Sequence, residues 1–371
     1  MSVAEFRMTT SDELSRKTIR QAEAESAIEA SGTPTLSICI ATYNRAGFIA
    51  ETLDSIVGQL EPFVELLVVD GASPDTTESV VAPYAARNAA VRYFREAVNS
   101  GVDADYDKAV AYARGTYCWL MTDDDLLEPG AIRRVLAALA DGPDLVVANA
   151  RVMTADFAAV LVPRSLPFDD DRRYNSGSGA LFEDVADYLS FIGGVVVRRE
   201  LWLQRDRASF YGTVFIHIGV LFQSPPIGRV TVISEPLIRI RYGNAMWTSR
   251  GFEIWMFKWP KLIWSFDGYA ADARARITSR EPWRRIRRLV HARAIGSYSI
   301  VEYRRYVACA AEGGGLTAAW LVARMPGSLA NAVAGTYCMV GNRAAKAAAY
   351  DLARSRHSTW VSRLAARWLI R

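Results

Sequence analysis

The sequence predicts an α/β protein with an open, mostly parallel sheet flanked by helices and a mainly helical C-terminal extension. Three observations support this fold class. Short apolar runs alternate with segments of helical periodicity between Leu36 and about residue 150. The run Val64–Asp70 is almost continuously apolar, which is typical of a parallel strand covered on both faces. Beyond Gly251 the chain is rich in Trp, Arg and Ala and has a helical pattern.

The elements of the predicted sheet follow in a regular order. Strands are expected at residues 36–40, 64–70, 91–94, 117–122 and 145–148, and later at 191–198 and 230–241. Helices are expected at 49–57, at 106–113 and from Pro129, a residue suited to the first helical position. Strands that alternate with helices favour an open parallel sheet, whose ligands bind beyond the carboxyl ends of the strands.

The same pattern suggests how the chain is divided. Residues 1–33 are polar and are expected to be a leader, in part disordered. Residues 34–250 form the predicted α/β domain, whose pattern is regular over 34–150 and less regular over 151–250. Residues 251–371 form the helical, Arg- and Trp-rich region.

Composition limits the classes of function. The 371-residue chain is 51% apolar, enough for a sizeable core, and its net charge of +4 gives no support to nucleic-acid binding. Its four cysteines are far apart, so neither a disulfide framework nor a zinc site is indicated. No signal pattern or apolar stretch long enough to span a bilayer is visible, so a cytoplasmic protein is expected.

The strongest chemical signal is the triplet Asp123, Asp124 and Asp125 directly after the predicted strand 117–122. Clustered carboxylates repel one another unless a cation is present, and hard divalent ions prefer such oxygen ligands together with phosphate oxygens. The alternative is a solvated acidic turn. The position at the carboxyl edge of the sheet favours the metal site.

Two further polar turns follow the first two strands. Thr42, Tyr43, Asn44 and Arg45 place hydrogen-bonding groups and a guanidinium at the start of a helix, which suits a phosphate or nucleotide, although an ordinary helix cap would use the same residues. Asp70 begins the turn to Asp75, where a carboxylate can accept hydrogen bonds from a base or ribose. Taken alone, that segment is a turn.

In order and spacing, these segments resemble the family 2 glycosyltransferases of GT-A fold, over about Leu36 to Asn149. Asn99-Ser100-Gly101 and Ala113-Arg114-Gly115 are similar to the family's approach to its metal motif. Tyr117–Asp125 and Arg241-Tyr242-Gly243-Asn244 look like the abequosyltransferase-like branch, which works on O-antigen-type glycans.

The resemblance implies that residues 34–250 are the catalytic domain, with nucleotide-sugar and metal binding in 34–150 and the acceptor side in 151–250. It also implies roles for single residues. Thr42, Tyr43, Asn44 and Arg45 would line the pocket of a nucleoside-diphosphate sugar, Asp70 would contact the base and Asp123 the ribose, with Asp124 beside them. Asp125, with Asp123, would hold Mg²⁺ or Mn²⁺ against the diphosphate, and Arg241 and Asn244 would lie at the acceptor or diphosphate. The sequence departs from the family at Ala41, where Pro is usual, and at Asp105 and Asp107, where Asn is frequent.

The catalytic base is harder to assign. The family usually places an Asp or Glu after a Gly-Gly strand, which residues 191–197 resemble, but residues 210–222 contain no carboxylate. His217 is the titratable group there with a near-neutral reference pKa, so it is the first candidate. A core histidine bonded to the backbone is the alternative interpretation. Glu183 and Asp184 are the fallback carboxylates.

The function expected from the resemblance is sugar transfer, by inversion, to a hydroxyl of a cell-surface glycan or its lipid-linked precursor. The alternatives are a glycan-binding or scaffold protein with a decayed transferase fold, and a nucleotidyltransferase, although the Gly-rich, Lys-bearing loop of the latter is missing after the first strand. A C-terminal helix through 359–371 would carry Trp360, Leu364 and Trp368 on one face with arginines at its border. That pattern predicts peripheral contact with the inner membrane, or packing of the helix on its own domain.

Overall fold

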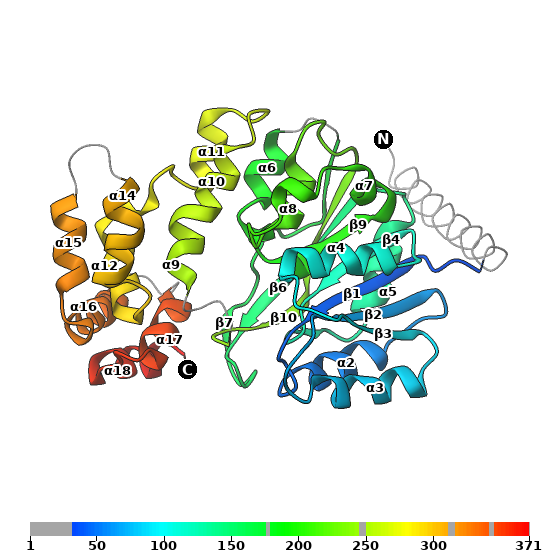
Figure 1. The fold of residues 1–371 in the computed structure, drawn as a ribbon, viewed down its shortest axis with the longest axis horizontal. Helices are drawn as coiled ribbons and strands as arrows, with labels where there is room; N and C mark the ends of the chain where they lie inside the picture. Colours follow the sequence, from blue (N-terminus) through cyan, green and yellow to red (C-terminus); the bar gives the residue numbers. More distant parts are fainter. Residues whose placement is uncertain (1–31, 176–178, 245–249, 311–315, 341–344, 371) are drawn as a thin grey trace, which may run out of the picture.

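The computed structural model describes residues 32–175, 179–244, 250–310, 316–340 and 345–370 (Figure 1). The predicted leader therefore lies, apart from its last two residues, outside the described part of the chain.

A ten-stranded mixed sheet forms the centre of the first 250 residues. Its main order is β3-β2-β1-β4-β9-β6-β10-β5, while β7 pairs with β6 and β8 with β10. The strands are β1 (Leu36–Thr42), β2 (Val64–Asp70), β3 (Val91–Arg95), β4 (Tyr117–Met121), β5 (Leu126–Leu127), β6 (Leu145–Met153), β7 (Val160–Val162), β8 (Arg172–Tyr174), β9 (Val195–Arg198) and β10 (Val230–Arg241). The half formed by β3, β2, β1 and β4 is parallel, as the apolar runs predicted.

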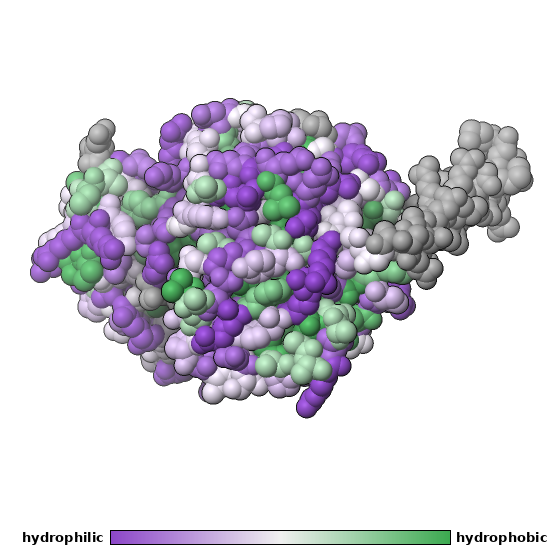
Figure 2. Space-filling view, turned by 45° about the vertical axis from the view of Figure 1, so that its right-hand side comes forward, coloured by the Kyte–Doolittle hydropathy of each residue, from purple (hydrophilic) through white to green (hydrophobic). Residues whose placement is uncertain are grey.

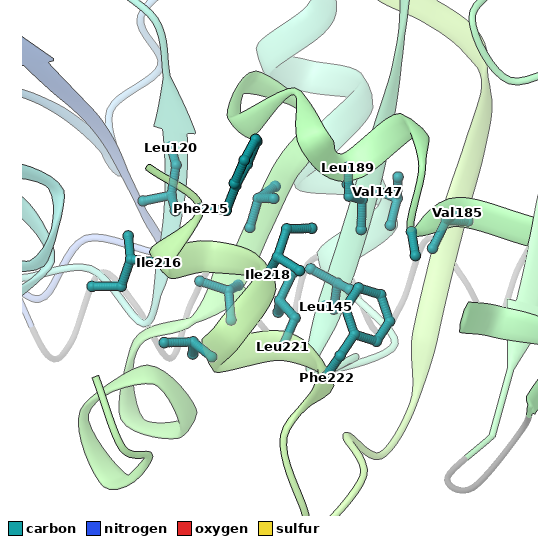
Figure 3. Close-up of a cluster of buried hydrophobic side chains, with 14 of the residues drawn as sticks. Leu120, Leu145, Val147, Val185, Leu189, Phe215, Ile216, Ile218, Leu221 and Phe222 are labelled. Carbon is teal, nitrogen blue, oxygen red and sulfur yellow. The ribbon is translucent and has the colours of Figure 1, made fainter. Parts of the chain in front are cut away.

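Alternating side chains of these strands fill two apolar layers, one on each face of the sheet. Ile38 and Ile40 of β1 point into the layer covered by α2 (Ile49–Val57), α3 (Thr77–Arg87) and α5 (Ala131–Leu139). Cys39 points into the opposite layer, covered by α4 (Val102–Tyr112), α6 (Gly179–Val185), α7 (Arg199–Gln204) and α8 (Ile216–Phe222). Figure 3 shows how α8 inserts its side chains against the strands in this second layer.

The strand expected at residues 191–198 is shorter than predicted. Residues Ile192–Gly194 form a 3₁₀ turn, and only Val195–Arg198 forms β9, which runs antiparallel between β4 and β6. A Cβ on Gly193 would lie 2.3 Å from the ring of Phe191, so the glycine allows that ring to fold over the turn. The carbonyl of Gly193 accepts a hydrogen bond from Trp119 Nε1 at 2.8 Å, which fixes the turn on β4.

The rest of the chain is helical and lies beside the sheet (Figure 1). Its helices are α9 (Gly251–Glu253), α10 (Trp259–Trp264), α11 (Ala271–Ile277), α12 (Ile286–Ile295), α13 (Ile300–Glu302), α14 (Ala308–Ala310), α15 (Leu316–Arg324), α16 (Gly327–Val340), α17 (Lys346–Arg354) and α18 (Trp360–Leu369). Residues Ile254–Lys258 and Tyr303–Val307 are π-helical. Helices α10 and α11 still pack in the core of the sheet, so that core extends beyond residue 250, whereas the later helices form two small cores of their own.

Within the described ranges, every helix is too short or too polar to cross a bilayer.

Candidate active site at the carboxyl edge of the sheet

Three polar turns meet where β1, β2 and β4 end. Thr42 at the end of β1 is in register with Asp70 at the end of β2, and Ile40 is in register with Met121 at the end of β4. The turns that follow these strands therefore lie side by side at the edge where open α/β sheets bind ligands.

The first turn brings a guanidinium to the aspartate triplet. The side chain of Arg45 is 10% exposed, and its Nε lies 3.3 Å from Asp123 Oδ1 while its Nη2 lies 3.0 Å from Asp124 Oδ2. Asn44 has a φ of +58°, and its N–H donates to Ser73 Oγ of the second turn at 2.9 Å. Thr42 is buried and Tyr43 is half-buried in the same turn. The predicted nucleotide-pocket residues are thus adjacent, and the guanidinium is paired with carboxylates.

The second turn is organised by Asp70. Its carboxylate is fully buried and accepts hydrogen bonds from the Ser73 N–H at 2.8 Å and from the Tyr93 hydroxyl at 2.7 Å. Burial and the bond to Asp70 raise the pKa of Tyr93 above its ordinary value. The carboxylate therefore points into the protein and holds the turn, in which Ala72 has a φ of +62°.

The third turn contains the triplet, of which Asp124 and Asp125 are 8% and 3% exposed. Asp125 Oδ2 accepts from the Thr122 hydroxyl at 2.5 Å and Oδ1 accepts from the N–H of Arg241 at 2.6 Å. Burial raises the pKa of all three carboxyls, that of Asp123 to about 7, with the charge of Asp124 adding to the effect and Arg45 opposing it. Burial thus disfavours the ionised form of these carboxyls, and a nearby cation would favour it.

The residues present fit a divalent cation. In the described residues no three or more His, Cys, Asp or Glu side chains are grouped so that they could hold a metal ion by themselves. Mg²⁺, however, is usually bound through one or two carboxylates plus substrate phosphates and water. Each oxygen of Asp125 accepts one hydrogen bond, and an ionised carboxylate has about four acceptor positions, so Asp125 keeps capacity for a metal.

Arg241 has a larger place in the site than the sequence indicated. Besides the N–H bond to Asp125, its side chain donates to Asp124 O at 2.9 Å, to Ala155 O at 2.8 Å and to Glu51 Oε2 at 2.7 Å. Its guanidinium lies 4.3 Å from the centroid of the Phe157 ring. Glu51 and Phe157 had no sequence signal, because each acquires its role only through this long-range contact.

Of the non-glycine residues with positive φ in the described chain, three lie around these turns and the fourth lies just before α8. They are Asn44, Ala72, Phe157 and Val214. A β-branched or aromatic residue is rarely found in this conformation, which costs of order 1–3 kcal/mol. Strain of this kind collects at functional sites because the surrounding contacts over-determine the backbone.

His217 lies in α8 and is 2% exposed. Its chain neighbours Ile216 and Ile218 belong to the apolar layer shown in Figure 3. Its Nε2 is 2.8 Å from the carbonyl oxygen of Leu189, so Nε2 carries the proton and donates. Nδ1 is buried and has no hydrogen-bond partner among the described residues. Burial lowers the pKa of His217 to about 4, opposed by the bond to Leu189. The ring is therefore neutral, with one lone pair unused, as in the core histidine of the alternative interpretation.

The fallback carboxylates are engaged elsewhere. Glu183 Oε1 pairs with Arg276 Nη2 at 2.6 Å, and Asp184 Oδ2 accepts from the Tyr174 hydroxyl at 2.6 Å and from Arg172 Nη1 at 3.1 Å. These contacts hold α6 against α11 and β8 rather than against the aspartate triplet.

Comparison with known proteins identifies the domain around these turns. Residues 37–178 match the family model described as Glycosyl transferase family 2. The chain is 28% identical over 231 residues to the abequosyltransferase RfbV of Salmonella typhimurium, a match that covers 58% of this chain and 69% of the relative.

Two solved structures share the architecture. TarS of S. aureus, residues 1–349 in complex with UDP, aligns with a TM-score of 0.54 at 15% identity over 90% of each chain. The mannosyltransferase PcManGT of Pyrobaculum calidifontis, in complex with GDP-Man and Mn²⁺, aligns with a TM-score of 0.50 at 19% identity over 91% of this chain and 88% of that one. At these identities the likeness establishes the fold, and it confirms the predicted GT-A architecture.

Proposed function

We propose that this chain, which carries a family 2 glycosyltransferase domain of GT-A fold, transfers a sugar from a nucleoside-diphosphate sugar to a hydroxyl of a cell-surface glycan or its lipid-linked precursor. The observation that carries the proposal is the aspartate triplet at the carboxyl edge of the sheet, of which Asp124 and Asp125 are buried, next to two turns that can surround a nucleotide. The similarity to an abequosyltransferase supports a role in O-antigen or related polysaccharide synthesis.

The donor would lie across the three turns. Thr42, Tyr43, Asn44 and Arg45 would line one wall of its pocket, and the turn held by Asp70 the other. Asp123 and Asp124 are paired with Arg45 in this structure, so the guanidinium lies beside the position expected for the diphosphate. Two solved structures of the same fold contain UDP and GDP-Man, which supports a nucleotide-sugar donor for this chain.

Mg²⁺ or Mn²⁺ would be held by Asp125 and Asp123 and would neutralise charge on the departing diphosphate. Arg241 orients Asp125 through its N–H and fixes the third turn through its guanidinium. The protein's part in this step is to present the carboxylates in one orientation.

His217 is the proposed general base of an inverting transfer. Its bond to Leu189 O fixes the tautomer and leaves the Nδ1 lone pair able to accept the proton of the acceptor hydroxyl. The 2% exposure of His217 means that the acceptor could reach Nδ1 only after the layer around it opens. The same observation favours the competing interpretation, a scaffold or glycan-binding protein without transfer activity. Glu183 and Asp184 are the next candidates if His217 fails the test.

The experiment is release of nucleoside diphosphate from a panel of sugar nucleotides, with and without Mn²⁺. We expect one donor to be turned over by the wild type, and no release by Asp125→Asn. A matched control is Asp169→Asn, since that carboxylate is fully exposed and pairs only with Arg164 on the surface. No release from any donor, in the presence of metal and of a lipid-linked acceptor mixture, would support the scaffold.

We also propose that α18 brings the enzyme to the cytoplasmic face of the inner membrane, where lipid-linked acceptors would be met. Ser362, Ala365 and Leu369 of α18 are buried, whereas Trp360, Leu364 and Trp368 are 70%, 49% and 53% exposed. The packing of α18 on its own domain thus leaves its aromatic face outward. On the face shown in Figure 2, apolar side chains form small areas among polar ones, one of them over the C-terminal helices at the left.

Arginines beside that face would favour anionic lipid, since a basic residue near such a surface contributes about 1 kcal/mol. The full-length chain should co-sediment with anionic liposomes at low salt, and replacing Trp360 and Trp368 by Ser should abolish this. Leu321→Ser is the control, because Leu321 is 56% exposed on α15 instead. Equal binding by both variants, or none by the wild type, would exclude α18 as the membrane contact.

A further inference from the structure

The C-terminal helix α17 contacts the strand end that orients the metal-binding aspartate. Arg241, Tyr242 and Gly243 are consecutive at the end of β10. Arg241 faces the aspartate triplet, whereas the next two residues face α17, which also packs on β7 near the end of the sheet (Figure 1).

The contact is close and polar. The Tyr242 hydroxyl donates to Asp351 Oδ2 at 2.7 Å, and the ring of Tyr350 lies against Gly243, where an added Cβ would be 3.1 Å from Cε1 of the ring. Gly243 has a φ of +93°, which glycine adopts without strain. Both the close approach and the backbone conformation therefore require glycine at this position.

A second contact runs through the loop after β6. The N–H of Ala155 donates to the Tyr350 hydroxyl at 3.0 Å, while the carbonyl of the same residue accepts from Arg241 Nη1 at 2.8 Å. The loop continues to Phe157, whose φ of +57° is strained and whose ring lies under the Arg241 guanidinium. One residue thus links Tyr350, which is 9% exposed, to the arginine of the site.

We propose that Tyr350 is a positioning residue for the donor and metal site, acting through Ala155 and Gly243 on Arg241 and hence on Asp125. The C-terminal helical region is on this view part of the catalytic apparatus through its contacts with the end of β10 and with the loop after β6. The identity of the ligands at this site rests on the proposed function. The link between Tyr350 and Arg241 is independent of it.

Two bonds of Arg241 show how the effect would be transmitted. Its side chain spans Asp124 O and Ala155 O, so a displacement of Ala155 moves the guanidinium. Its N–H holds Asp125 Oδ1, so a displacement of the strand end turns the carboxylate. Small errors of this kind weaken metal binding because Mg²⁺ tolerates little deviation from ideal ligand geometry.

The test is Tyr350→Phe, which removes one hydroxyl and keeps the ring against Gly243. Tyr337→Phe is the matched control, because Tyr337 is a 61% exposed tyrosine on α16 whose polar contact is with Arg287. Amide hydrogen exchange of the full-length protein needs no ligand. The Arg241 amide should exchange roughly five- to tenfold faster in Tyr350→Phe, as expected for a weakened hydrogen bond. In Tyr337→Phe its exchange rate should stay as in the wild type.

Kinetics give the second readout. The Mn²⁺ and donor concentrations for half-maximal release of nucleoside diphosphate should rise several-fold in Tyr350→Phe, while kcat at saturation stays within a factor of two or so, because ground-state binding is what changes. Faster exchange throughout the chain, or the same exchange of Arg241 in both variants, would show that Tyr350 has a structural role only and would overturn the proposal. A wild type without activity would refute the proposed function, and the exchange measurement would still decide this inference.

Discussion

Replacement of His217 by glutamine tests both its burial and its role. Glutamine was chosen because its side-chain amide can reach Leu189 O as a donor, as Nε2 does in the structure. The pKa of His217 is lowered to about 4 by burial, whereas an unfolded histidine titrates near 6.5. The unfolded chain therefore binds a proton at this residue more readily than the folded one does.

The sign and size of the effect follow from linkage. The contribution of neutral His217 to stability is complete above pH 6.5 and is lost as the pH falls toward 4. A difference of about two and a half pKa units corresponds to about 3 kcal/mol at most, since each unit is worth 1.36 kcal/mol. That is a large share of a typical folding free energy of about 5–15 kcal/mol.

The assay is thermal unfolding of wild type and His217→Gln between pH 7.5 and 5. Many carboxylates also titrate in this range, so the informative quantity is the difference in Tm between the two proteins. The wild type should lose stability relative to the variant as the pH falls. A difference that stays constant with pH would mean that His217 is not held neutral in the core, and the argument from burial would be refuted.

Turnover of the same variant tests the catalytic role. A general base contributes typically about 10²–10⁴ to the rate, so kcat should fall by that factor while the affinity for the donor is kept. Normal turnover in a stably folded variant would remove His217 from catalysis and leave Glu183 and Asp184 to be tested.

Three further changes give sharp expectations. Asp125→Ala, or excess chelator with the wild type, should abolish nucleoside diphosphate release, and full activity in chelator would exclude a metal. Asp70→Ala should weaken donor binding and also destabilise the fold by about 1.5–3 kcal/mol, because the Ser73 N–H and the Tyr93 hydroxyl lose a buried carboxylate; unchanged Tm and donor Kd would contradict this. Burial raises the pKa of Asp351 to about 6, so its ionised form is disfavoured in the folded state, and Asp351→Asn should gain Tm relative to wild type as the pH rises from about 4 to 6. If the Tm of Asp351→Asn fell relative to that of the wild type between pH 4 and 6, the burial of Asp351 would be contradicted.

The sequence predicted the strands and the turns of the donor side because both are local. Val64–Asp70 is buried at every position, so its environment favours an almost continuous apolar run, and the buried Glu65 within it is bonded to Ser37 and Arg92. Asp123 and Asp70 follow such runs directly, and parallel strands bring their carboxyl ends to one edge whatever the intervening helices contain.

The environment of each side chain could not be predicted in the same way. Asp70 was expected to face a ligand, yet its carboxylate closes its own turn, since a fully buried charge must be satisfied by nearby donors. The contact of Tyr350 with Ala155 joins residues 195 positions apart, and no periodic pattern encodes it. The strand predicted at residues 191–198 is too long, because the apolar neighbours of Phe191 and Gly193 suggested a strand. In the structure the ring of Phe191 packs on Gly193 instead.

Arg45 and Arg241 differ in which of their present contacts they could give up. Arg241 uses its guanidinium on two backbone carbonyls and Glu51 and stacks on Phe157, so moving it would leave buried carbonyls unpaired. Arg45 makes ion pairs with Asp123 and Asp124, and it has one bond to a backbone carbonyl, from Nη1 to Asn244 O at 3.2 Å. If a divalent cation took over part of the negative charge of the triplet, the attraction holding Arg45 would fall, and its planar guanidinium suits bidentate contact with a phosphate. We therefore expect Arg45 to exchange carboxylate for diphosphate when metal and donor bind, while Arg241 stays in place and keeps Asp125 oriented.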